Sequence, residues 1–118
     1  MSVTDFPKRF HLDLAHALNG DINWLPFRAG IEIHRICGDG SAGASSALLR
    51  YAPGARLPCH EHDGYEHILV LSGSQFDEHG RYPTGTLTVS TPGSKHSVGS
   101  DEGCVVLAIW GAPVRFDV

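Results

Sequence analysis

The sequence predicts an all-β domain, a small antiparallel barrel or sandwich, and three observations lead to this fold class. First, 14 Gly and 7 Pro among the 118 residues separate short segments rich in Val, Ile, Leu and Thr. Second, these segments recur at spacings of roughly ten residues, as in antiparallel β proteins. Third, no helical pattern long enough for a βαβ crossover lies between them, which argues against a parallel sheet.

Residues 1–23 are expected to form a short N-terminal extension, and residues 24–118 the barrel, in a single domain. In the extension, apolar residues recur every four positions at Phe6, Phe10, Leu14 and Leu18. This period is typical of an amphipathic helix, which Asn19-Gly20 would end. The alternation over residues 10–14 fits a strand equally, so both interpretations stay open.

The expected strands are rich in β-branched or large apolar side chains and are bounded by turn residues. They span residues 31–36, 46–51, 66–71, 75–77, 86–90 and 104–110. Turns are expected between them at Gly38-Asp39-Gly40, Pro53-Gly54, Ser72-Gly73, Pro83-Thr84-Gly85 and Pro92-Gly93.

Two of these strands predict a further contact surface. Residues 86–90 alternate between apolar and polar side chains, so one face meets the core and the other meets water. Residues 68–71 and 105–109 do not alternate, which indicates that both of their faces are covered. One face can fill the barrel, whereas the other needs the N-terminal segment or a second subunit. We therefore expect a homodimer.

Composition excludes several classes of partner. Lys and Arg number 9 against 13 Asp and Glu, a formal net charge of -4, so neither nucleic acid nor an anionic membrane is expected to bind. No stretch approaches the roughly 18 apolar residues of a membrane span. Lys8 and Arg9 are not followed by the apolar run of a secretory signal.

The cysteine pattern predicts a reducing environment. The 3 cysteines include no C-x-x-C pair, which argues against a zinc ribbon and a disulfide framework. We expect Cys37, Cys59 and Cys104 to be small apolar core residues of a cytoplasmic protein.

Histidine is unusually frequent, with 8 residues, and it is the side chain that both titrates near neutrality and binds metals. His60 and His62 are two positions apart, so on an extended chain they project to the same face. Glu66 follows a bend expected at Asp63-Gly64 and begins the next strand. His96 comes after a Pro-Gly turn that would place it at the same rim. These residues can therefore converge on one ion.

Imidazole suits Zn, Cu, Fe and Ni, and a carboxylate adds charge neutralisation and suits harder ions. Three nitrogens and one oxygen can close a tetrahedron around Zn²⁺, or leave two positions open on a six-coordinate ion. We therefore expect one divalent metal ion per chain, Zn, Fe, Mn or Ni, held by His60, His62, Glu66 and His96. Glu66 is the expected catalytic residue, because it either ligates permanently or swings away as a general base.

Neighbouring residues are assigned by strand parity. His67 adjoins Glu66, so it should point to the opposite face, outside the barrel. Cys59 should face away from the ligands because it precedes His60. Candidates to line the pocket are Tyr65, Gln75, Phe76 and Tyr82, whereas Trp24, Phe27 and Trp110 are expected to serve in packing.

The residues around the candidate ligands resemble the cupin superfamily. Gly54-x5-His60-x-His62-x3-Glu66-x6-Gly73 agrees with the first cupin motif in residue type and spacing. Gly85-x6-Pro92-x-Ser94-x-His96 is similar to the second motif, with glycine one residue early and no closing Asn. Within the superfamily, residues 50–55, 77–85, 92–96 and 102–105 resemble the ChrR-type, anti-sigma-factor cupin-like branch, and the resemblance covers about residues 24–116.

The resemblance implies a single-domain cupin, a double-stranded β-helix or jelly roll, with the metal held by the four candidate ligands. Related cupins include dioxygenases, isomerases and decarboxylases, so fold alone does not choose. We expect a mononuclear metal-dependent enzyme, dioxygenase- or isomerase-like, acting on a small oxygen-rich organic molecule. The alternative is a non-catalytic zinc-binding sensor or ligand-binding module. Anti-sigma members carry a separate helical zinc domain for which 118 residues leave no room, so sigma-factor binding is not expected.

Overall fold

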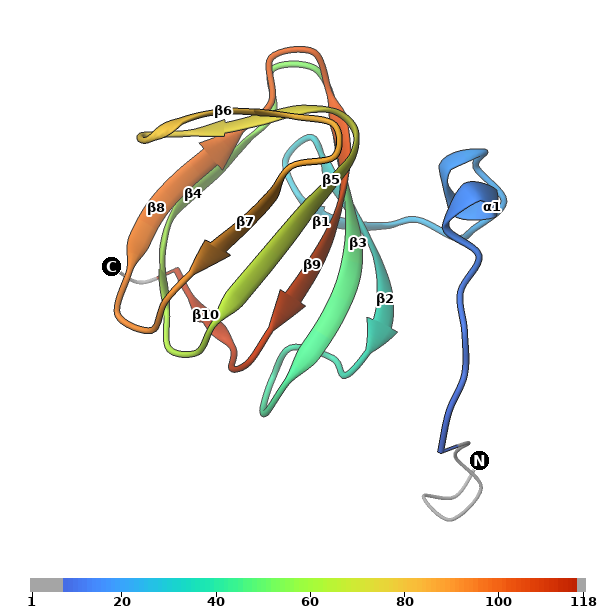
Figure 1. Ribbon diagram of the computed structural model, residues 1–118, viewed down its shortest axis with the longest axis horizontal. Coiled ribbons are helices and arrows are strands. Elements are labelled where there is room, and N and C mark those ends of the chain that lie inside the picture. Colours follow the sequence, from blue (N-terminus) through green and yellow to red (C-terminus); the bar gives the residue numbers. More distant parts are fainter. Residues whose placement is uncertain (1–7, 117–118) are drawn as a thin grey trace.

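The computed structural model describes residues 8–116, and Figure 1 shows how their elements are arranged. Within that range the chain forms a short helix, α1 (Leu14–Leu18), and a 10-stranded sheet. The strands are β1 (Leu25–Arg28), β2 (Ile31–Cys37), β3 (Ser45–Tyr51), β4 (Arg56–His62), β5 (Glu66–Asp77), β6 (Gly80–Pro83), β7 (Leu87–Ser90), β8 (Lys95–Gly99), β9 (Cys104–Trp110) and β10 (Val114–Arg115).

The strands form an antiparallel sheet that curls on itself (Figure 1). Their order is β1-β2-β3-β9-β5-β8-β4-β10, and β6 and β7 both pair with β5. Strand β5 joins the two sides of the curl, because its first half pairs with β9 and β7 and its second half pairs with β6 and touches β8. This architecture confirms the predicted all-β class and its small antiparallel barrel.

Strand β5 corrects one prediction. Residues 66–71 and 75–77 were expected to be separate strands joined by a turn at Ser72-Gly73, but they form one strand. The pairing with β9 shifts register between Val70 and Ser72, and Gly73 has a φ of 70°. A Cβ on Gly73 would lie 2.0 Å from the Gly103 carbonyl oxygen. The glycine therefore serves a bulge that bends the strand, not a turn that ends it.

Alternate side chains of the strands point into the curl and form the core. Ile33 of β2, Leu49 of β3, Ile68 of β5 and Val106 of β9 are all buried there. Glu66 lies two residues before Ile68 on the same strand, so it shares this inner face. The hydrophobic core and the candidate ligands are therefore built on one continuous surface.

The outer face of the sheet carries apolar side chains that the described chain leaves partly open. Leu69 of β5 pairs with Leu107 of β9 on one side and with Leu87 of β7 on the other. Leu87 is 56% exposed, Val89 53% and Ile109 48%. The inner faces of β5 and β9 are covered as expected. Within residues 8–116 their outer faces are half-buried, apart from the exposed Ile109.

Helix α1 is shorter than the helix predicted from the four-residue spacing of Phe6, Phe10, Leu14 and Leu18. Asp13 caps it by accepting hydrogen bonds from the Ala15 and His16 backbone N–H groups at 3.0 and 3.3 Å. The helix ends after Leu18, and Phe6 lies outside the described residues. Figure 1 shows α1 to one side of the curled sheet. No helix in the described part of the chain is both long and apolar enough to cross a membrane.

The cysteines follow the prediction in one case of the three. Cys104, on the inner face of β9, is buried as expected. Cys37 and Cys59 are exposed, so their assignment to the core was wrong. Cys59 does face away from His60, as parity requires, but the outer side of β4 meets solvent at Pro58 and Cys59 and forms no second core.

Candidate metal centre

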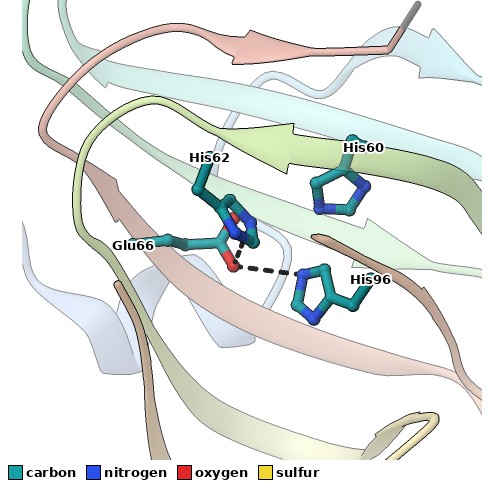
Figure 2. Close-up of side chains that lie close together, drawn as sticks. All are labelled: His60, His62, Glu66 and His96. Carbon is teal, nitrogen blue, oxygen red and sulfur yellow. Dashed lines mark ion pairs between the residues drawn. The ribbon is translucent and has the colours of Figure 1, made fainter. Parts of the chain in front are cut away.

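The four predicted ligands come together on three strands. Strand β4 supplies His60 and His62, β5 begins at Glu66, and β8 supplies His96. His60 and His96 face each other directly across the β4–β8 pair. All four side chains are buried, and Figure 2 shows them pointing toward one another inside the curl.

The ligand atoms surround a common point. One nitrogen or oxygen from each residue lies within 4.8 Å of the corresponding atom of the others, a grouping that could hold a metal ion. The Oε1 atom of Glu66 lies 3.2 Å from Nε2 of His62 and 3.4 Å from Nε2 of His96 (Figure 2). The three imidazole rings have centroids 4.7 to 5.0 Å apart and stand edge to face.

Hydrogen bonds on the far side of the rings fix the tautomers of His60 and His62. The His60 Nδ1–H group donates to the Pro58 carbonyl at 2.9 Å, since a carbonyl can only accept. Ser94 gives its hydroxyl proton to the Thr91 carbonyl, so its oxygen accepts from the Nδ1–H group of His62 at 2.9 Å. In both rings Nε2 keeps its lone pair, which is the form that binds a metal.

The third ring is oriented by a carboxylate. Nδ1 of His96 lies 3.3 Å from Oδ2 of Asp77, while the other oxygen of Asp77 accepts from the Tyr82 hydroxyl at 2.6 Å and from the His79 backbone N–H at 2.8 Å. Burial opposes ionisation of Asp77, but these donors outweigh it and hold its pKa below the ordinary value. The carboxylate is therefore charged and aimed at His96, a common arrangement behind metal-binding histidines.

Trp110 orients the acidic ligand. Its indole N–H donates to Oε2 of Glu66 at 2.8 Å and leaves Oε1 directed at the histidines. Burial disfavours the charged carboxylate, but hydrogen bonding, including that of the Trp110 N–H, outweighs burial and holds the pKa of Glu66 below its ordinary value. The carboxylate is therefore ionised at neutral pH.

Two buried nitrogen atoms without hydrogen-bond partners in the described chain indicate that the donor set fits a metal ion. The Nε2 atoms of His62 and His96 are buried and have no hydrogen-bond partner within residues 8–116, although both lie close to Glu66. A buried nitrogen without a partner costs free energy, about 1–3 kcal/mol, unless something else satisfies it. Burial also lowers the pKa of His60, which favours the neutral ligand form. A divalent cation at the common point would satisfy all of these atoms.

A cavity of about 230 Å³ opens beside the ligands. His60, Glu66 and His96 lie in its wall, together with Tyr51, Gln75 and Trp110. The Tyr51 hydroxyl is buried, which raises its pKa, and Gln75 hydrogen-bonds to it. The volume suits a small organic molecule more than a drug-sized one.

The other residues that were predicted to line the pocket or to pack differ in whether the structure bears out their predicted places. Gln75 lines the cavity as expected, whereas Tyr65 and Phe76 do not and Tyr82 lies in the wall of a different hollow. His67 is on the outer face between Val89 and Ile109, as parity predicted. Trp110 was assigned to packing alone, but its N–H binds a candidate ligand.

Sequence reasoning also missed the residues that orient the histidines. Asp77 and Tyr82 come from β5 and β6, and Ser94 precedes β8. Their spacing to the ligands is not periodic, so only the register of the folded sheet shows the contacts. The same holds for Trp110, which lies directly opposite Glu66 in the β5–β9 register.

The curled antiparallel sheet and the buried cluster of three histidines and a glutamate define a cupin domain with a candidate metal site. The family model of the ChrR cupin-like domain matches residues 6–113. The chain therefore belongs to the family of ChrR cupin-like domains.

Similar proteins agree with this assignment. The chain is 32% identical over 100 residues to the anti-sigma-E factor ChrR of Cereibacter sphaeroides, a match that covers 82% of this chain and 46% of that protein. The chain thus spans about half the length of this relative. The structure of Rhodobacter sphaeroides SigE in complex with the anti-sigma ChrR matches with a TM-score of 0.69 and 26% identity, covering 76% of this chain and 50% of that one.

A third similarity concerns the fold alone. The structure of a putative acetylacetone dioxygenase from Methylibium petroleiphilum PM1 matches with a TM-score of 0.80 and 14% identity, over 99% of this chain and 86% of that one. The high coverage shows that the whole curled sheet is shared. At this identity it shows nothing about the reaction.

Proposed function

We propose that the cupin barrel of this chain, residues 24–118 after an extension of residues 1–23, binds one divalent metal ion through His60, His62, Glu66 and His96. On this proposal it acts as a mononuclear metal-dependent enzyme, dioxygenase- or isomerase-like, on a small oxygen-rich organic molecule. The observation that carries the proposal is the pair of buried, unpartnered Nε2 atoms aimed at one carboxylate oxygen beside a cavity.

The chain's own residues divide the work. The three histidines, each oriented through Nδ1, hold the site rigid before any ligand enters. When bound, a divalent ion of the Zn, Fe, Mn or Ni type supplies Lewis-acid polarisation, and iron adds redox chemistry. Glu66 either stays a ligand or leaves the site to act as a general base, and the Trp110 N–H stabilises the charged form that both roles require.

A second candidate function has its own support. The relative with 32% identity is an anti-sigma factor, not an enzyme by name. Three nitrogens and one oxygen can also close a tetrahedron around zinc and leave no position open for a substrate. On this alternative the domain is a non-catalytic zinc-binding sensor that recognises a small ligand in its cavity.

Metal identity and turnover separate the two functions. The chain is expressed without a metal-chelating tag, its metal content per chain is measured, and oxygen consumption and isomerisation are followed with a panel of β-diketones after reconstitution with Fe(II) or Zn(II). Turnover that depends on the ion supports the enzyme. Stoichiometric zinc with no turnover supports the sensor, and a chain that takes up no divalent ion contradicts both.

We also propose that the outer face of β5, β7 and β9 is a homodimer interface. Leu87, Val89 and Ile109 are exposed there around the half-buried Leu69 and Leu107. Removing such a surface from water favours association by about 25 cal/mol per Å². Light scattering should show a dimer that Leu87→Lys converts to a monomer, and a wild-type monomer at high concentration would contradict the interface.

The cytoplasm is the compartment we propose. Cys37 and Cys59 are free and exposed, and exposed thiols persist best where the environment is reducing. Thiol titration of the protein isolated from a native extract would show both cysteines reduced.

A further inference from the structure

We propose that the cavity takes a small organic anion whose metal-binding oxygens face His60, Glu66 and His96 and whose carboxylate is held at the mouth by Arg28. This inference names the substrate class for the proposed function and rests on it. It applies to the enzyme and to the sensor alike, because both need a ligand in this cavity.

Arg28 is an exposed residue of the cavity wall and stacks on two aromatic rings, which places it where the cavity meets solvent. It is the last residue of β1, it lines the cavity, and its guanidinium carbon lies 4.4 Å from the ring centroid of Phe116 and 5.1 Å from that of Phe27. The Phe116 ring lies 5.4 Å, centroid to centroid, from the ring of His60. The cation is therefore one aromatic ring away from a candidate metal ligand, and stacking restricts its motion.

The guanidinium of Arg28 is not used elsewhere in the described chain. Within residues 8–116 no carboxylate pairs with it, whereas Arg50 binds Glu32 at 2.7 Å and Arg81 lies 3.5 Å from Asp101. Its five N–H donors match the two oxygens of a carboxylate in a way that a lysine cannot. An arginine held on two rings at a cavity mouth therefore offers a ready site for an anionic group.

The charges around the cavity favour an anion as well. Arg35 shares the inner parity of Ile31 and Ile33 on β2 and also lines the cavity, where Asp39 partly offsets it. With a divalent cation at the candidate site, positive charges around the cavity outnumber the negative charges of Glu66 and Asp39. A cationic ligand would be repelled, and a neutral one would leave Arg28 without a partner.

Two compounds of nearly equal shape test the proposal. Heptane-2,4-dione and 4,6-dioxoheptanoate share a β-diketone, which chelates metals, and differ in a terminal methyl against a carboxylate. Binding of each to the zinc-loaded full chain is measured by calorimetry, so no turnover interferes. We expect 4,6-dioxoheptanoate to bind at least about tenfold more tightly, the effect of one well-formed hydrogen-bonded charge pair.

Variants assign that preference to Arg28. In Arg28→Gln the preference should fall to about threefold or less while the affinity for heptane-2,4-dione changes little, and Arg28→Lys should keep part of it. The matched control is Arg56→Gln, because Arg56 also stacks on an aromatic ring, 4.9 Å from the centroid of Phe76, but does not line the cavity. This control should keep the full preference.

The outcomes distinguish a failure of this inference from a failure of the proposed function on which it rests. Equal affinities of the zinc-loaded chain for the two compounds, or no binding of 4,6-dioxoheptanoate, would overturn the anion assignment and leave the metal site standing. A preference unchanged in Arg28→Gln would overturn the role of Arg28. A chain that takes up no zinc would overturn the proposed function, and this inference with it.

Discussion

At the scale of single residues, the candidate site depends on the group that accepts a hydrogen bond from Nδ1 of each histidine. A backbone carbonyl orients His60, a hydroxyl orients His62 and a carboxylate orients His96. These acceptors differ in kind, but each takes the proton of Nδ1 and leaves Nε2 for a ligand. The tautomers are therefore set by the fold before a metal arrives, which reduces the cost of organising the site.

Removing one ligand should empty the site. In His62→Ala the metal content per chain should fall strongly, because an ion held by the remaining groups is under-coordinated. The matched control is His67→Ala, a histidine of the outer face that should leave metal content unchanged. Full occupancy in His62→Ala, measured by elemental analysis, would count against the assigned ligands.

The carboxylate behind His96 should tune affinity without abolishing binding. Asp77→Asn keeps the shape of the side chain but removes the charge that supports the His96 imidazole, so metal affinity should weaken by about 10- to 100-fold. Competition with a calibrated chelator measures the change. Asp101→Asn, an exposed carboxylate near Arg81, is the control, and an equal loss in both variants would show a nonspecific charge effect.

At the scale of elements, the sequence predicts the strands with strong apolar character and misses the short or polar ones. The expected segments became β2, β3, β5, β7 and β9. Strands β1, β6, β8 and β10 were not predicted, because their residues are few or polar and their pairing is fixed by neighbours distant in sequence. Strand β4 was foreseen only as an extended segment around His60 and His62.

The candidate ligands could be predicted because strand parity and spacing are local. His60 and His62 needed only an extended chain, and the motif spacing added Glu66 and His96. The residues behind them could not be predicted, because Asp77 and Trp110 meet the ligands through the register of a curled sheet. Register depends on the bulge at Gly73, which reads in the sequence as a turn.

The bulge gives a prediction about stability. Gly73→Ala places a Cβ 2.0 Å from the Gly103 oxygen, so backbone must move, and the free energy of unfolding should fall by more than about 3 kcal/mol. Gly85→Ala is the matched control, because its φ is also positive, 90°, but nothing lies within 4 Å. It should lose only the strain of the left-handed backbone, about 1–2 kcal/mol. Equal losses in urea unfolding would contradict the steric account.

At the scale of the whole molecule, the candidate site ties together strands that are distant along the chain. Its ligands lie on β4, β5 and β8, and β5 is the strand shared by both sides of the curl. An ion that binds the folded chain and not the unfolded one stabilises the fold by mass action. Metal binding should therefore report on the integrity of the entire sheet.

Acid should remove this stabilisation. Metal-binding histidines must be neutral, so protons compete with the ion as the pH falls below about 6. Burial lowers the pKa of His60 in the fold, so without metal its contribution to stability is lost as the pH falls from its unfolded pKa through its lower folded pKa. Burial lowers the pKa of His96, but the carboxylates of Glu66 and Asp77 outweigh burial and raise it above its ordinary value. Protonation of His96 therefore stabilises the fold at low pH, opposite to the effect of His60.

Melting temperatures with and without metal at pH 7.5 and pH 5 measure the effect. The increase that the ion produces at pH 7.5 should largely vanish at pH 5. Metal content measured after dialysis at each pH is the companion observation. An increase of equal size at both values, with the ion retained to pH 4, would contradict ligation by histidine.

The bond between the Trp110 indole and Glu66 gives the protein an optical reporter of its own. The chain has 2 tryptophans, and the other, Trp24, stacks under Arg50 beside His34, away from the candidate ligands. In a Trp24→Phe variant the fluorescence would therefore come from Trp110 alone. The N–H of its indole donates a hydrogen bond to the carboxylate that a cation would bind. Titration of an ion, or of a chelator that withdraws it, could be followed in the fluorimeter without any label.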